Sequence, residues 1–126
     1  IIMNISKKAE WALRIGIAGE FIGHGVFALQ GKQSWIKYFE AIGIPAETAP
    51  TLMLIVGILD VLLGVLVLIK PWKPALLWMT TGGFLPALIR PIAGEPIWDF
   101  VERWANWGAP LALYFLVSRE TKNNAS

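Results

Sequence analysis

The sequence predicts an all-α integral membrane protein, a bundle of four helices that cross the bilayer. Hydrophobic residues make up 56% of its 126 residues and charged residues only 16%, whereas an average soluble domain carries about 25% charged residues. Four apolar segments, each near the roughly 20 residues that a membrane helix needs, almost fill the chain. These segments lack the polar outer face that the core helices of a soluble bundle would present. Residues 1–126 are therefore predicted to form a single membrane domain.

The predicted spans differ in the charges that interrupt them. The first span contains three ionisable residues, and the second contains Asp60 as its only charge. The third is uncharged up to Arg90 at its end, and the fourth is uncharged over residues 104–117. Residues 119–126 are expected to be a polar C-terminal tail. We expect the four helices at residues 11–29, 49–69, 74–90 and 97–118.

The connections have the composition of turns at a membrane surface. Residues 70–74 contain two prolines, two lysines and a Trp suited to headgroup depth. Residues 33–42, between the first two spans, predict a short amphipathic helix. We expect it to lie in the membrane interface; the alternative is an ordinary connector, because one apolar face does not distinguish lipid from protein. The predicted apolar face consists of Trp35, Tyr38, Phe39 and Ile42.

The distribution of Lys and Arg predicts the orientation, because cytoplasmic loops carry the excess of these residues. The side that holds both termini carries six of them: Lys7, Lys8, Lys70, Lys73, Arg119 and Lys122. The opposite side carries four: Lys32, Lys37, Arg90 and Arg103. Both termini are therefore predicted to be cytoplasmic.

Two carboxylates lie near the middle of predicted spans, Glu20 in the first and Asp60 in the second. A carboxylate at the bilayer centre costs about 2.5–3.5 kcal/mol on insertion scales, so each needs a partner, a proton or a wet cavity. Glu20 and His24 are four residues apart and share one helical face. Gly19 and Gly23 have the spacing that lets another helix approach closely. This face is therefore predicted to point into the bundle.

The sequence leaves open the partners of two further charges. Arg14 lies about 9 Å from Glu20 along the helix axis, at 1.5 Å per residue. Its side chain either extends to the headgroups or bends toward Asp60. We expect Asp60 to be structural, paired with Arg14 or with the hydroxyl of Thr80 or Thr81.

A polar cluster is predicted beneath the outer surface. Its members are Glu20, His24, Arg90, Glu102 and Arg103, with Trp98, Trp104 and Trp107 around it. Such a cluster suits proton-coupled chemistry, or a quinone headgroup held by His and Arg donors and aromatic rings. The alternative is structural: buried ion pairs fix helix register, end-of-helix charges reach water, and Trp residues form an interfacial belt.

We single out candidate residues without assigning a catalytic one. The main candidates for ligand binding or proton handling are Glu20, His24, Asp60 and Arg90. The secondary candidates are Arg14, Glu102, Arg103 and Trp104.

The composition excludes several kinds of site within this chain. With no Cys and one His, the chain lacks the ligand sets of disulfides, iron–sulfur clusters, thiolate zinc sites and bis-histidine haem. No metal site is predicted, because Glu20 and His24 do not have the Glu-x-x-His spacing of di-iron bundles. A net charge of +2 is too small and too scattered to indicate nucleic-acid binding.

Short motifs carry a resemblance to a known family. They are Arg14-Ile15-Gly16, Phe21-Ile22-Gly23-His24-Gly25, Asp60-Val61-Leu62-Leu63-Gly64 and the stretch over residues 102–111. Together they resemble the DoxX-like family of small four-helix bacterial membrane proteins, with its Arg…Phe…His-Gly and Glu-x-x-x-Gly patterns and Asp60 in place of the Glu. Residues 26–30 depart from the pattern, since the basic residue that often follows His-Gly is absent.

The resemblance implies a four-helix bundle in a prokaryotic inner membrane, and a role close to redox chemistry. We predict an accessory subunit of a respiratory or quinol oxidase-type complex that holds no prosthetic group of its own. Its partners would be the lipid bilayer and other membrane subunits or copies of itself. The alternatives are a quinone-binding or proton-coupled oxidoreductase component, with quinone as its ligand, and a small oligomeric transporter.

Overall fold

The computed structural model describes residues 5–125, which form helices joined by short turns and contain no strand. The elements are α1 (Ile5–Leu29), η1 (Gln33–Trp35), α2 (Ile36–Ala41), α3 (Ala49–Ile69), α4 (Lys73–Ile92), α5 (Ile97–Val101) and α6 (Ala105–Ala125).

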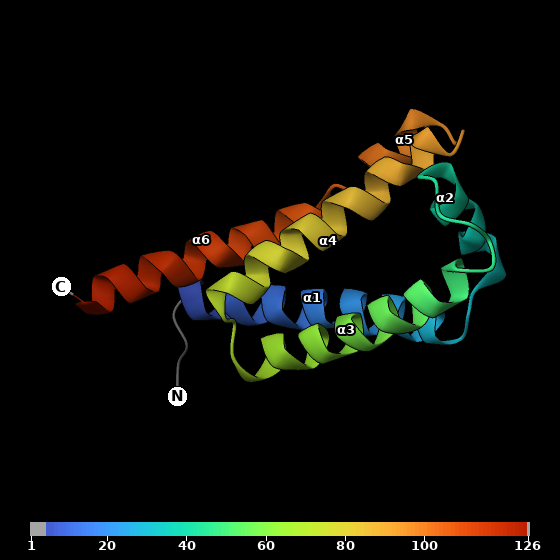
Figure 1. The fold of residues 1–126 in the computed structure, drawn as a ribbon. Coiled ribbons are helices and arrows are strands. Elements are labelled where there is room, and N and C mark those ends of the chain that lie inside the picture. The colour runs from blue at the N-terminus through green and yellow to red at the C-terminus, as the bar shows by residue number, and fades with distance from the viewer. Residues whose placement is uncertain (1–4, 126) are drawn as a thin grey trace.

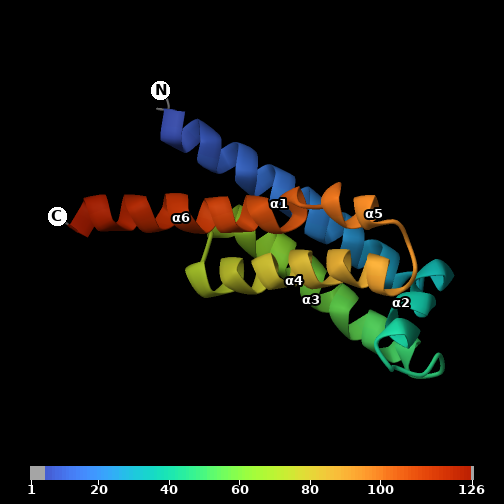
Figure 2. The same cartoon turned by 90° about the horizontal axis from the view of Figure 1, so that it is seen from above.

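The four long helices form two antiparallel pairs that lie one above the other. Helix α1 packs along α3, α4 packs along α6, and α6 also contacts α1 (Figure 1). Seen from above, α4 and α6 run side by side across α1 and α3 (Figure 2). The start of α1 and the end of α6 lie at the same end of the molecule, whereas η1, α2 and α5 lie at the other. Helix α2 contacts both α3 and α4, so it bridges the two pairs.

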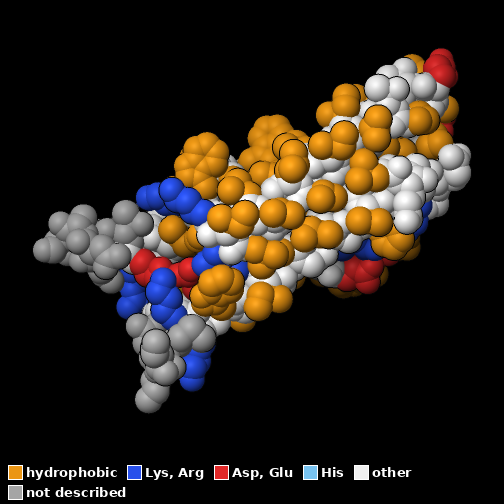
Figure 3. All heavy atoms as spheres, turned by 90° about the horizontal axis from the view of Figure 1, so that it is seen from below, with side chains coloured by type: hydrophobic (Ala, Val, Ile, Leu, Met, Phe, Trp, Pro, Cys, Tyr) orange, Lys and Arg blue, Asp and Glu red, His pale blue; other side chains and the backbone are white. Residues whose placement is uncertain are grey.

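Three of the described helices, α1, α3 and α4, are long and apolar enough to cross a membrane. Helix α3 has the bounds expected for the second span, and α4 extends the third to Ile92. Helix α1 begins at Ile5, earlier than expected. Hydrophobic side chains are spread over the face of the molecule seen in Figure 3, and large apolar residues of α1, α3 and α4 are exposed, as contact with lipid requires. The chain is therefore a small integral membrane protein.

The predicted fourth span is interrupted. Helix α5 ends at Val101, and a turn separates it from α6, which starts at Ala105. Residues 105–117 are the apolar part of α6; at 1.5 Å per residue they cover about 20 Å, against about 30 Å of hydrocarbon. Helix α6 then continues to Ala125. The residues expected to form a polar tail are thus helical to that point, and Ser126 lies outside the described residues.

Helices α1 and α3 approach most closely at glycines that the sequence analysis did not select. A Cβ atom on Gly25 would lie 2.8 Å from the carbonyl oxygen of Gly57, and one on Gly57 would lie 2.9 Å from the carbonyl oxygen of Gly25. Gly19 and Gly23 have nothing within 4 Å of their Cβ positions. The expectation that Gly19 and Gly23 make the close contact is therefore wrong, because α3 packs against the neighbouring face of α1.

We expect Gly57→Ala to lower the free energy of unfolding by about 1–3 kcal/mol, the usual range for overpacking. The added methyl group meets backbone atoms of α1, which have no rotamer by which to move away. Gly19→Ala is the matched control, since open space surrounds that position. Reversible unfolding in mixed micelles measures both variants. Equal stabilities for the two variants would contradict the close crossing.

Candidate functional site

His24 of α1 and Asp60 of α3 form a polar pair between the two helices. His24 Nδ1 lies 2.9 Å from Asp60 Oδ2, and Asp60 is buried. With Asp60 ionised, its carboxylate only accepts hydrogen bonds, so Nδ1 is then the donor and Nε2 remains to accept or donate elsewhere. The expected partners of Asp60 are wrong: the Thr80 and Thr81 hydroxyls donate to the carbonyls of Leu76 and Leu77 in their own helix.

A second contact fixes the imidazole of His24 from its face. The indole of Trp35 stacks on it, with ring centroids 4.6 Å apart and planes at 25°. Asp60 holds one ring nitrogen and Trp35 holds the ring plane, so His24 has a defined orientation. A histidine oriented in this way by a carboxylate is preorganised to exchange a proton or a hydrogen bond through Nε2.

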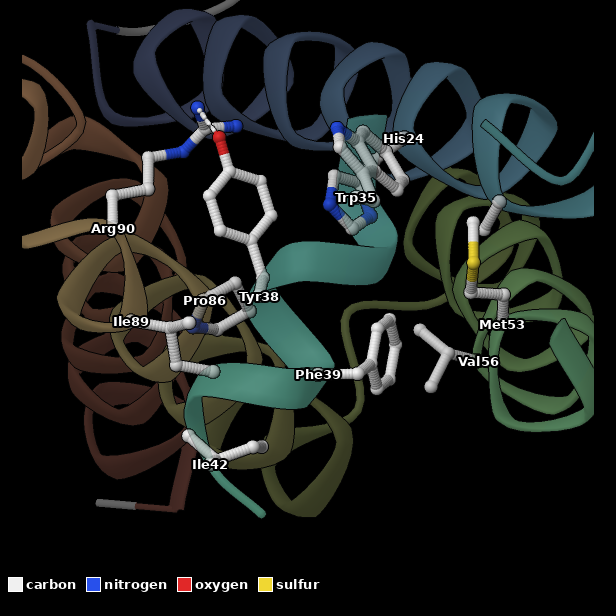
Figure 4. A pocket seen from close by; sticks show the side chains of 11 residues that line it. His24, Trp35, Tyr38, Phe39, Ile42, Met53, Val56, Pro86, Ile89 and Arg90 are labelled. Atoms are coloured by element: carbon white, nitrogen blue, oxygen red, sulfur yellow. Dashed lines mark hydrogen bonds between the residues drawn. The ribbon is translucent and has the colours of Figure 1, made fainter. Parts of the chain in front are cut away.

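Beside His24 lies a cavity of about 170 Å³, which we call the aromatic cavity (Figure 4). It lies where α2 bridges the two helix pairs, and α1, α2, α3 and α4 all contribute to its wall. Its lining is mostly apolar, with His24, Tyr38 and Arg90 as the ionisable members. The lining residues are His24, Ala28, Trp35, Tyr38, Phe39, Ile42, Met53, Val56, Pro86, Ile89 and Arg90.

Arg90 is held at the cavity wall by Tyr38 and Glu95. Arg90 Nη1 donates to Tyr38 Oη at 2.9 Å, and that hydroxyl donates to the Glu95 carboxylate at 2.8 Å. Burial raises the pKa of Tyr38, and its hydrogen bond to Glu95 raises the pKa further. The phenol therefore keeps its proton and serves as the donor. This network ties α2 to α4 and the following loop; Glu95 was not among the sequence candidates.

The amphipathic segment at residues 33–42 exists as η1 and α2, but its apolar face points into the protein. Trp35, Tyr38 and Phe39 are half-buried and line the aromatic cavity. This favours the second interpretation, that of a connector packed on protein. The signal was present in the sequence, where aromatic residues on one face lie opposite Lys37 and Glu40.

Glu20 does not join the arginines of the predicted cluster. It lies against a small polar space of about 30 Å³, which we call the polar chamber. Among residues 5–125 Glu20 forms no hydrogen bond or ion pair. The chamber is lined by Glu20, Phe21, His24, Asp60, Gly82, Gly83, Pro86 and Asn106.

The secondary candidates have structural contacts away from both cavities. Arg103 Nη1 donates to the Asp99 carbonyl at 2.8 Å and to the Glu102 carboxylate at 2.6 Å. Trp104 packs edge-on against Phe100. The members of the predicted outer cluster are therefore apart in the structure. Arg90 and His24 line the aromatic cavity, whereas Arg103 and Glu102 pair with each other outside it. Within the described residues, no group of three His, Cys, Asp or Glu side chains is placed to hold a metal ion.

Arg14 neither extends to the headgroups nor reaches Asp60. Its Nε donates to the Val67 carbonyl at 2.8 Å and its Nη2 to the Leu68 carbonyl at 2.5 Å. Its Nη1 pairs with Glu10 at 3.1 Å. Both arginine and glutamate are buried. Arg14 thus caps the C-terminal end of α3, where carbonyl groups have no partner within the helix.

Comparison with known proteins identifies the family of the chain. No curated protein and no solved structure matches the chain. The family model of DoxX matches residues 10–84, which run from α1 into α4 and include His24, Trp35 and Asp60. This match covers more than half of the chain, and the protein is therefore an integral membrane protein of the DoxX family.

Proposed function

We propose that this DoxX-family protein binds the headgroup of a quinone in the aromatic cavity, as a component of a membrane respiratory or redox complex. The observation that carries the proposal is the pairing of polar groups with an apolar wall. His24 and Arg90 lie in the lining of a cavity whose other walls are aromatic and aliphatic. Ligand sites typically combine such apolar walls with a few placed polar groups.

The size of the aromatic cavity fits one six-membered ring. A dry cavity of about 150 Å³ with apolar walls holds benzene, and this one measures about 170 Å³. A quinone would bring two carbonyl oxygens, which accept hydrogen bonds. Arg90 can donate to such an oxygen, and so can a protonated His24 through Nε2. Trp35, Tyr38 and Phe39 supply the faces against which a flat ring packs.

The wall also offers an apolar exit for a lipid tail. Ile42 and Val56 line the cavity and yet are 47% and 36% exposed at the molecular surface. An isoprenoid chain attached to a bound ring can therefore leave the cavity between apolar side chains and enter the bilayer. A ligand that is itself dissolved in the membrane fits this arrangement better than one that arrives from water.

The proposed accessory role is supported by the ligands that this chain offers. The sequence has no Cys and one His, so it lacks ligands for an iron–sulfur cluster or a bis-histidine haem. Electrons exchanged with a bound quinone would pass to or from a group held by another subunit. The proposed setting is a prokaryotic inner membrane, with self-association or partner subunits burying part of the exposed apolar surface.

We also propose that α6 is the fourth crossing and that both termini are cytoplasmic. The start of α1 and the end of α6 lie at one end of the bundle (Figure 1), together with Lys70 and Lys73 at the α3–α4 turn. An excess of positive charge at that end favours the cytoplasmic side. The short apolar part of α6 requires local bilayer thinning or a covering partner helix, both known responses to mismatch.

The test of quinone binding is a titration in nanodiscs with a short-chain ubiquinone, followed by Trp fluorescence quenching. An isoprenoid alcohol with the same tail is the control for partition into lipid. We expect saturable binding of the quinone and no saturable effect of the alcohol. If the two ligands give the same unsaturated response, the quinone site is wrong.

The accessory role is tested separately by gentle-detergent purification from native membranes, with mass spectrometry of the eluate. We expect oxidase or dehydrogenase subunits to co-purify. A homogeneous protein that turns over quinone alone would contradict the accessory role.

A further inference from the structure

The polar chamber lies where all four long helices converge. Its wall comes from α1 (Glu20, Phe21 and His24), from α3 (Asp60), from α4 and from α6 (Asn106). Helix α4 contributes two glycines and a proline, so no α4 side chain other than the proline ring occupies the space. A volume of about 30 Å³ exceeds the roughly 10–15 Å³ that one water molecule requires.

Two prolines leave carbonyl groups without helical partners at this chamber. Pro86 has no N–H to donate to the carbonyl of Gly82, four residues earlier in α4. Pro110 likewise has none for the carbonyl of Asn106 in α6. Both Gly82 and Asn106 line the chamber. At membrane depth a freed carbonyl must find another partner, and ordered water is one of those that serve.

The remaining polar groups of the chamber also match a water site. A buried water typically makes two to four hydrogen bonds to otherwise unsatisfied groups. Glu20 forms no hydrogen bond or ion pair with any other residue in 5–125. Asp60 uses one carboxylate oxygen for His24, which leaves the other. The chamber thus brings together Glu20, Asp60 and two residues with freed carbonyls, Gly82 and Asn106, around a space that fits water.

His24 lies in the wall between this chamber and the aromatic cavity. His24 and Pro86 are the two residues that line both spaces. His24 therefore borders both the polar chamber and the space proposed for the quinone ring. Glu20 and Asp60 line the chamber alone, so His24 is the ionisable residue that links the two spaces.

We propose that the polar chamber holds water that carries a proton between the carboxyl group of Glu20 and the His24–Asp60 pair. In this step the Glu20 carboxyl loses a proton and becomes a carboxylate, and His24 gains that proton at Nε2 while its Nδ1 proton stays on the hydrogen bond to Asp60. The pair can then release it to a ligand in the aromatic cavity through His24 Nε2. The identity of that ligand rests on the proposed function, whereas the proton step does not.

Few charged groups surround the proposed proton transfer. Glu20 and His24 face the chamber from α1, and Asp60 faces it from α3. Helices α4 and α6 present no titratable side chain to it; their contributions are Gly82, Gly83, Pro86 and Asn106. Proton exchange within the chamber therefore involves these three groups and the water between them.

The single His makes the test specific, because a ¹⁵N-histidine label reports on His24 alone. In nanodiscs without quinone, we expect water magnetisation to reach the imidazole N–H of the wild type. We expect Glu20→Gln to keep this contact, since an amide also hydrogen-bonds water, and to slow imidazole N–H exchange by at least about tenfold. Glu40→Gln, an exposed carboxylate on α2, is the matched control and should exchange as the wild type does.

A second variant tests the water itself. A Cβ on Gly82 would lie 3.8 Å from Phe21 Cε1, an ordinary contact, so Gly82→Ala folds and reduces the chamber. We expect it to weaken the water signal at His24, whereas Gly16→Ala, with nothing near its Cβ, leaves the signal unchanged. Absence of water transfer in the wild type would overturn the proposal, as would equal exchange rates in Glu20→Gln and Glu40→Gln.

Quinone titration of the same variants separates this inference from the proposed function. We expect Glu20→Gln to bind the quinone as the wild type does, because Glu20 does not line the aromatic cavity. If the wild type binds no quinone but shows the water contact and the Glu20 effect, the proton step stands and the ligand assignment fails. If quinone binds normally and Glu20→Gln has no effect on exchange, the proton step fails alone.

Discussion

Arg14→Met is expected to lower the free energy of unfolding by about 3–5 kcal/mol, the range for removing one partner of a buried ion pair. Methionine keeps most of the apolar stem and removes the guanidinium. The carbonyls of Val67 and Leu68 then lose their donors at the end of α3, and buried Glu10 loses a partner at 3.1 Å. Arg14 joins α1 to α3 more than fifty residues away, so its loss acts on the tertiary packing.

The control and the rescue for this prediction are available in the same chain. Arg119 is exposed on α6, and Arg119→Met should change the stability by no more than about 0.5 kcal/mol. Adding Glu10→Gln to Arg14→Met should recover part of the loss, because it removes a buried charge that only half-exposed Lys7 would still pair with. Unfolding in mixed micelles measures all three. A loss no greater than that of Arg119→Met would show that Arg14 does not cap α3.

His24→Phe is expected to weaken quinone binding by about 10- to 100-fold, equivalent to about 1.4–2.8 kcal/mol. Phenylalanine fits the space of the imidazole and preserves the stack on Trp35, but it has no nitrogen to bond a carbonyl oxygen or Asp60. The change therefore removes the polar contact while keeping the shape of the aromatic cavity. Titration with the short-chain ubiquinone measures it.

Tyr114→Phe provides the comparison for His24→Phe. Tyr114 lies on α6 outside the aromatic cavity, so loss of its hydroxyl should leave the affinity within about twofold of the wild type. Asp60→Asn should have an intermediate effect, because it keeps a hydrogen-bonding group beside His24 but removes the negative charge. Equal affinities for His24→Phe and Tyr114→Phe would exclude His24 from the binding site.

The transmembrane helices could be predicted from sequence because the hydropathy of a span depends only on its own residues. The second span agrees with α3 at both ends, where residues 70–74 supply a strong stop signal. The break between α5 and α6 was not predicted, because the mean hydropathy of residues 97–118 conceals a turn at Glu102 and Arg103. Those charges in the expected span were the signal that could have revealed it.

The sequence indicated which residues lie at the candidate site, but it did not indicate which of them contact one another. Glu20, His24, Asp60 and Arg90 all line one of the two cavities. The pairing of His24 with Asp60 depends on the register of α1 against α3, which Gly25 and Gly57 set through their close approach. No local pattern encodes that register, so Arg14 was assigned as a possible partner of Asp60 instead.

Tyr38 on α2 shows a further limit of prediction from the sequence. Tyr38 and Glu95 are 57 residues apart in the chain, and their hydrogen bond exists only because α2 lies between the two helix pairs. The sequence showed an apolar face on this segment but did not show what covers it. The location of α2 is what converts an amphipathic connector into the wall of a cavity.

Photo-crosslinking tests most directly whether the aromatic cavity beside His24 holds a quinone ring. An azido-quinone is irradiated with the protein in nanodiscs, and the labelled peptides are identified by mass spectrometry. We predict labelling within residues 35–42 and near Met53 and Ile89, suppressed by excess unlabelled quinone. Labelling confined to the lipid-facing side chains of α3, such as Leu54 and Leu62, and insensitive to competitor would contradict the claim.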